Sequence, residues 1–123
     1  VSAAIWAARP DGPYDMLLGI GAAPEGVITA TAIRGIGGVF EGRLVFRSDE
    51  EEKRAEKMVN DDLTRLWDAT DLCRSDDAIF AASGVCDGYL PGAILAEKHT
   101  TTFSEIIDVE SGTVRKIETT RQL

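Results

Sequence analysis

Apolar and polar residues along the chain form short segments that predict alternating helices and strands. Val1–Ala8 is rich in alanine and precedes a proline-rich turn, which predicts a helix. Tyr14–Ile20 holds a short apolar run between turn residues, which is typical of a buried strand. Pro24 suits the first turn of a helix that continues over Val27–Ile36, and Val39–Phe46 alternates like a second strand. Two strands joined by a helix predict a parallel pair with a right-handed crossover.

The second half of the chain continues the mixed pattern. Ser48–Val59 is strongly charged and predicts a solvated helix with acidic residues in its first turn. Asp77–Ala82 predicts a third buried strand, and Tyr89–Leu95 a short helix or turn. His99–Asp108 and Thr113–Thr119 are rich in Thr, Ile and Val on either side of a turn, which predicts an antiparallel hairpin. The whole pattern predicts an α/β fold.

Composition narrows the class of protein. The chain has 123 residues, 44% of them hydrophobic, which suits one folded unit over residues 1–123. It begins with Val1 rather than Met, so we expect a chain that is processed, trimmed or a piece of something longer. The net charge of -8 argues against nucleic-acid binding, and the apolar runs are too short to cross a membrane. The two cysteines lie outside any Cys-x-x-Cys motif, so we expect reduced thiols in a cytoplasmic protein.

The segment Gly19–Gly26 carries the most chemical information. Its glycines allow the backbone to approach a ligand, and the helix start that follows offers free N–H groups to an anion such as phosphate. Glu25, in the first helical turn, has a carboxylate suited to a hard cation such as Mg²⁺. The alternative is that Glu25 only complements the helix dipole and the glycines only make a tight turn.

Other interpretations stay open from the residues alone. Gly19-Ile20-Gly21 begins a dinucleotide-binding pattern, although Pro24 replaces its third glycine, so a nucleotide-binding module is one alternative. A non-catalytic regulatory or interaction domain is another. In the loop after the third predicted strand, Ser83 and Asp87 are candidate ligand contacts, or Asp87 with its following glycine simply makes a turn.

Cysteine catalysis has little support in the sequence. Cys86 would need a nearby base, and the single histidine, His99, belongs more naturally to a solvated loop. Trp6 and Trp67 are most simply packing residues of a core or an interface.

Several motifs, in order over nearly the whole chain, resemble class II fructose-1,6-bisphosphatases. The first is the specific Gly-x-Gly-x-x-Pro-Glu-Gly element of Gly19–Gly26. The others are Ala32-Ile33-Arg34-Gly35-Ile36-Gly37-Gly38, Glu41-Gly42-Arg43-Leu44, Ala78-Ile79-Phe80-Ala81-Ala82-Ser83-Gly84-Val85-Cys86-Asp87-Gly88, Thr100-Thr101-Thr102 and Gly112-Thr113-Val114-Arg115. The resemblance covers about the last third of the family's length, so it implies the carboxyl-terminal part of a larger catalytic domain.

The resemblance implies a fold, an activity and a site. The fold would be the carboxyl-terminal portion, with a mixed sheet, of the layered sugar-phosphatase fold, which is inositol monophosphatase-like. The activity would be hydrolysis of fructose 1,6-bisphosphate, and in some lineages of sedoheptulose 1,7-bisphosphate, with Mg²⁺ or Mn²⁺, and a homo-oligomer is expected. Glu25 would be a metal ligand, and Ala22, where the family usually has glycine, would contact the substrate through its backbone. The other ligands and the catalytic residues would lie upstream, so we expect the chain alone to be inactive.

Overall fold

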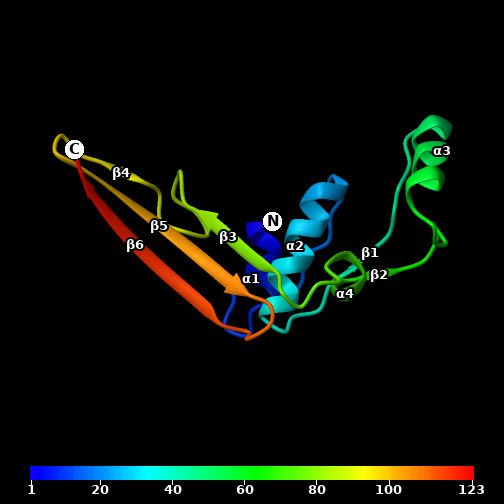
Figure 1. The fold of residues 1–123 in the computed structure, drawn as a ribbon, viewed down its shortest axis with the longest axis horizontal. Coiled ribbons are helices and arrows are strands. Elements are labelled where there is room, and N and C mark those ends of the chain that lie inside the picture. The colour runs from blue at the N-terminus through cyan, green and yellow to red at the C-terminus, as the bar shows by residue number, and fades with distance from the viewer.

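The computed structural model describes all 123 residues. Its largest feature is a four-stranded antiparallel sheet (Figure 1). β5 (His99–Asp108) is the central strand. On one side it pairs with β3 (Ile79–Ser83) and, further along, with the short β4 (Ile94–Leu95). On its other side it pairs with β6 (Val114–Gln122), all nine residues of which are exposed. β6 is therefore an outer edge of the sheet.

The hairpin of β5 and β6 confirms the prediction made from the Thr-rich segments. Its register runs from His99 opposite Gln122 to Ile107 opposite Val114. In the turn, the Asp108 carboxylate accepts hydrogen bonds from the backbone N–H and the hydroxyl of Ser111, at 2.9 and 3.0 Å. Together with Gly112, whose φ of 63° a glycine adopts readily, these short local bonds fix the register of the longest strand pair.

Helices α1 (Ser2–Ala8) and α2 (Ala23–Gly35) lie against one face of the sheet near β3, and the part of the sheet toward β4 extends beyond them (Figure 1). The core between these helices and the sheet consists of Ile5, Ala32, Phe80 and Ile107. A Cβ atom on Gly35 would lie 2.5 Å from Cγ2 of Ile107, so the absent side chain lets α2 approach β5 closely. The opposite face of the sheet has no helix over it.

A smaller group of elements lies beside α2. β1 (Glu41–Gly42) pairs antiparallel with β2 (Trp67–Asp68), and β2 leads directly into α4 (Ala69–Leu72). The Arg34 guanidinium donates hydrogen bonds to the backbone oxygens of Cys73 and Ser75, both at 2.7 Å, and pairs with Asp76. These contacts tie the end of α2 to the chain that follows α4.

The charged helix is present as predicted. α3 (Asp49–Met58) has no buried residue and stands away from the remainder of the molecule in Figure 1. Ser48 is its N-cap, and the Ser48 hydroxyl accepts a hydrogen bond from the backbone N–H of Glu51 at 3.3 Å. None of the helices combines the length and the apolar character that a membrane crossing requires.

The prediction of a parallel pair of strands around α2 is wrong for this chain. Tyr14–Ile20 is not a strand, and Val39–Phe46 contributes only Glu41 and Gly42 to a strand, in an antiparallel pair. A strand needs a partner for its backbone groups, and no segment of the chain pairs with Tyr14–Ile20.

Two other predictions need smaller corrections. The predicted third strand exists as β3, but it is half-buried rather than buried, since the sheet is covered on one face only: Phe80 is buried and Ile79 is exposed. Tyr89–Leu95 forms no helix, because Pro91 and Gly92 interrupt it, and its last two residues form β4.

Candidate functional site

The segment Gly19–Gly26, for which we predicted a role in ligand binding, leads into α2 and forms its first turn. Ala22 is the N-cap with an extended backbone, and its carbonyl oxygen accepts a hydrogen bond from Gly26 N–H at 3.1 Å. Pro24 lies in the first turn, as its missing N–H and fixed φ favour. No side chain caps this end of the helix, so its first N–H groups remain available.

Glu25 lies in that first turn with an exposed side chain. Its position next to free N–H groups is favourable for an anionic carboxylate, which fits the dipole interpretation as well as the metal interpretation. A divalent cation takes several oxygen ligands, and no group of three or more His, Cys, Asp or Glu side chains in this chain could hold a metal ion. The donors present therefore do not form a metal site on their own.

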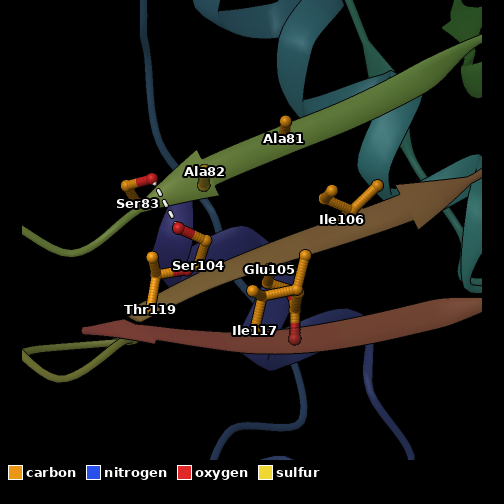
Figure 2. Close-up of a pocket in the computed structure, with 8 residues that line it drawn as sticks. All are labelled: Ala81, Ala82, Ser83, Ser104, Glu105, Ile106, Ile117 and Thr119. Atoms are coloured by element: carbon orange, nitrogen blue, oxygen red, sulfur yellow. Dashed lines mark hydrogen bonds between the residues drawn. The ribbon is translucent and has the colours of Figure 1, made fainter. Parts of the chain in front are cut away.

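The second candidate segment, after β3, is held by local structure. Figure 2 shows the Ser83 hydroxyl facing that of Ser104 across β3 and β5, and the two oxygens are 2.7 Å apart. The Asp87 carboxylate accepts a hydrogen bond from Gly92 N–H at 2.8 Å, which closes the loop back on itself. Both polar groups thus have structural partners, and the local hydrogen bond of Asp87 is in keeping with the turn interpretation.

Ser83 and Ser104 line a shallow cavity of about 340 Å³ on the uncovered face of the sheet (Figure 2). Its other lining residues are Ala81, Ala82, Glu105, Ile106, Ile117 and Thr119. No lysine or arginine lines it, so it lacks the charge needed to hold a phosphate group. Neither Ala22 nor Glu25 lines it.

The cysteines, the histidine and the tryptophans have structural settings. Cys73 is buried, Cys86 is exposed, and both are free thiols. His99 begins β5 opposite Gln122, within the sheet rather than in the expected loop. Trp67 is buried, with the Arg65 guanidinium 4.7 Å from its ring centroid, which confirms the packing role.

A buried charged network that sequence reasoning missed joins α1 to the sheet. Glu105, 1% exposed in the middle of β5, accepts two hydrogen bonds from Arg9, both at 2.9 Å. The Tyr89 hydroxyl donates a third, at 2.5 Å. Burial, and then the hydrogen bond to Glu105, raise the pKa of Tyr89 to about 12.

The same network borders a second cavity, of about 520 Å³, between the α1 end and the sheet. Trp6 lies over Tyr89 at its wall, with ring centroids 5.5 Å apart in an edge-to-face arrangement. Two cationic residues line this cavity, Arg9 and Lys116. The Arg9 guanidinium is already hydrogen-bonded to Glu105. Glu25 does not line this cavity either.

Comparison with known proteins identifies the family. A family model described as "Bacterial fructose-1,6-bisphosphatase, glpX-encoded" matches residues 1–121. The chain belongs to this family. The resemblance inferred from the Gly19–Gly26 element is thereby confirmed, and so is an α/β fold at the coarse level.

Named relatives of the family cover the chain but extend well beyond it. A protein of Acaryochloris marina (strain MBIC 11017), named D-fructose 1,6-bisphosphatase class 2/sedoheptulose 1,7-bisphosphatase 1, is 36% identical over 136 residues, covering 100% of this chain and 39% of the relative. A protein of Prochlorococcus marinus (strain MIT 9515), with the same name lacking the final numeral, is 36% identical over 104 residues, 74% of this chain and 31% of the relative. The chain thus spans about a third of the length of the curated relatives it matches.

Proposed function

We propose that this chain is the carboxyl-terminal part of a class II fructose-1,6-bisphosphatase, in which Glu25 supplies one ligand to a catalytic divalent metal. The observation that carries the proposal is the exposed Glu25 carboxylate on the first turn of α2, within the Gly-x-Gly-x-x-Pro-Glu-Gly element of a chain matched by the family over residues 1–121. The reaction is hydrolysis of fructose 1,6-bisphosphate to fructose 6-phosphate and phosphate. The metal would be Mg²⁺ or Mn²⁺, whose preference for oxygen ligands suits a carboxylate.

The finer parts of the proposal follow from the family. Residues 1–123 form one unit within the layered sugar-phosphatase fold, Ala22 contacts the substrate through its backbone, and the whole enzyme is a cytoplasmic homo-oligomer. Sedoheptulose 1,7-bisphosphate is a second substrate, in keeping with the names of the relatives. Two free cysteines agree with a reducing compartment.

The chain alone is expected to be inactive, because one carboxylate cannot assemble a metal site. The test compares two proteins. One is the 123-residue chain, and the other is the Acaryochloris relative with its matched stretch replaced by this chain. Phosphate release from fructose 1,6-bisphosphate with Mn²⁺ should be absent in the first and steady in the second.

Glu25→Gln in the replaced relative is the specific variant. Loss of a metal ligand should lower turnover at least about 100-fold, equivalent to about 3 kcal/mol of transition-state stabilisation. Glu52→Gln, an exposed acid of α3, is the matched control and should leave turnover unchanged. Equal turnover of the two variants would remove Glu25 from the ligand set.

The alternatives give different results in calorimetry. A nucleotide-binding module built on Gly19–Pro24 would bind NAD or ATP without metal. A regulatory or interaction domain would bind neither metal nor sugar phosphate in the replaced relative. Metal-dependent binding of the sugar bisphosphate that is lost with Glu25→Gln is the result that supports the proposal.

A further inference from the structure

The cavity of about 520 Å³ between the end of α1 and the sheet has the size of a small-molecule site. It is lined by the end of α1 and the turn after it, by the loop after β3, and by β5 and β6. No residue of Gly19–Gly26 lines it, so the proposed function leaves this cavity without a role.

Arg9, in the wall of this cavity, has donors that the chain does not use. Both of its hydrogen bonds to Glu105 come from Nη2, while Nη1 donates to no protein group and Nε is buried without a partner. Buried donors in folded proteins are normally paired, and a charged one gains most from a charged acceptor. The guanidinium can therefore accept a further oxygen ligand, such as a carboxylate.

Lys116 adds a second cation beside Arg9. In the register of the hairpin, Lys116 lies opposite Glu105, which holds Arg9. Lys116 also lines the cavity and forms no ion pair with an acid of the chain. Since Glu105 offsets only one of the two positive charges, this part of the cavity has one cation in excess.

Two further acids line the cavity, and both are exposed and take part in no ion pair. Glu118 follows Lys116 by two residues on β6, opposite Phe103, and Asp11 lies in the turn after α1. Side chains two residues apart on a strand share a face, with their Cα atoms roughly 7 Å apart. The cavity thus offers a cation and an acid a few ångströms apart, neither of which has a partner.

Aromatic side chains supply the apolar walls of the same cavity. Trp6, Tyr89 and Phe103 all line it. Trp6 and Tyr89 contact each other edge to face, with ring centroids 5.5 Å apart, so each holds the other in place. Such walls favour a ligand that carries an apolar group next to its charges.

We propose that this cavity binds a free α-amino acid with an apolar or aromatic side chain. The carboxylate of the ligand accepts hydrogen bonds from Arg9 and Lys116, its ammonium group donates to the acids, and its side chain packs on the aromatic walls. A phosphate group would meet two uncompensated acids, and an amine without a carboxylate would meet the excess cation. The inference goes beyond the proposed function and does not depend on it.

Calorimetry with three probes that share one ring tests the proposal. The probes are phenylalanine, phenethylamine, which lacks the carboxylate, and phenylpropionate, which lacks the ammonium group. In the 123-residue chain or in the replaced Acaryochloris relative, phenylalanine should bind at least about 10-fold more tightly than either single-charge probe. Equal or tighter binding of a single-charge probe would overturn the proposal, and so would the absence of phenylalanine binding in both proteins.

Two exposed residues of β6 give the specific variants, Lys116→Met and Glu118→Gln. Each should weaken phenylalanine binding about 10-fold or more, since each removes one of the two opposite charges. Lys53→Met and Glu52→Gln, on the exposed helix α3, are the matched controls and should leave the affinity unchanged. Equal melting temperatures of all four variants would show that the fold is intact. Unchanged affinity in either β6 variant would overturn the proposal.

Discussion

At Glu105 a carboxylate is held away from water by two partners that come from distant parts of the chain. Arg9, at the end of α1, is 96 residues away in sequence, and Tyr89 lies in the loop after β3. Burying an ion pair costs desolvation, but removing one partner leaves a buried charge uncompensated. The network therefore makes the position of α1 on the sheet specific, since another docking of α1 would leave Glu105 unpaired.

Glu105→Ala should lower the free energy of unfolding by about 3–5 kcal/mol, because the Arg9 charge is left without its partner. Asp61→Ala is the control, since Asp61 pairs with Arg65 at the surface, with side chains 35% and 33% exposed. That variant should cost less than about 1 kcal/mol. Urea denaturation measures the free energy of unfolding of both variants. An equal loss of this free energy in the two variants would contradict a special role for the buried pair.

Tyr89 gives the chain a dependence on alkaline pH. Its pKa is raised from 10.0 to about 12, first by burial and then by the hydrogen bond to Glu105. Between these two values the unfolded chain loses the phenolic proton while the folded chain keeps it, so the stability present below pH 10 falls as pH rises towards 12. Tyr89→Phe should flatten this part of the stability profile, as followed by denaturation at a series of pH values. A profile unchanged by Tyr89→Phe would contradict the assignment.

Among the elements, α3 depends least on the remainder of the molecule. It buries no residue, and its support is local: the Ser48 cap and a hydrogen bond from Arg47 N–H to the Glu51 carboxylate at 2.9 Å. Acidic residues in its first turn also complement the helix dipole. The helix therefore depends on its own end rather than on packing.

Ser48→Ala should reduce the helical signal in circular dichroism without changing the melting temperature of the sheet. Loss of an N-cap costs roughly 1 kcal/mol, which is enough to unfold a solvated helix of 10 residues but is not transmitted to a core that the helix does not touch. Asp68→Ala provides the contrast, since Asp68 caps α4 beside the buried Trp67 and should lower the melting temperature. A lowered melting temperature with Ser48→Ala would show that α3 is packed.

At the scale of the whole molecule, local signals predicted the fold best. Pro24 at a helix start, Ser48 as a cap and the Thr-rich hairpin each act within a few residues, and the structure has all three. The same local signal located Glu25 on the first turn of its helix.

Features that depend on distant residues escaped prediction. The Arg9–Glu105 pair cannot be recognised from spacing, because charge complementarity across the fold leaves no periodic pattern in the sequence. Tyr14–Ile20 has the composition of a strand, but a strand forms only where another segment pairs with it, and this chain provides none. A metal site likewise could not be completed from one acid, so Glu25 remains a single donor.

The outer edge formed by β6 also bears on how the chain behaves in concentrated solution. A long unpaired edge invites other chains to add to it and to grow into aggregates. β6 carries three cations and an anion, Arg115, Lys116, Arg121 and Glu118, and its side chains are exposed. Added copies would bring like charges together, which discourages such growth at low ionic strength, whereas salt at about 1 M shortens the range of this repulsion to about 3 Å. The solubility of the chain is thus tied to the charges on its last strand.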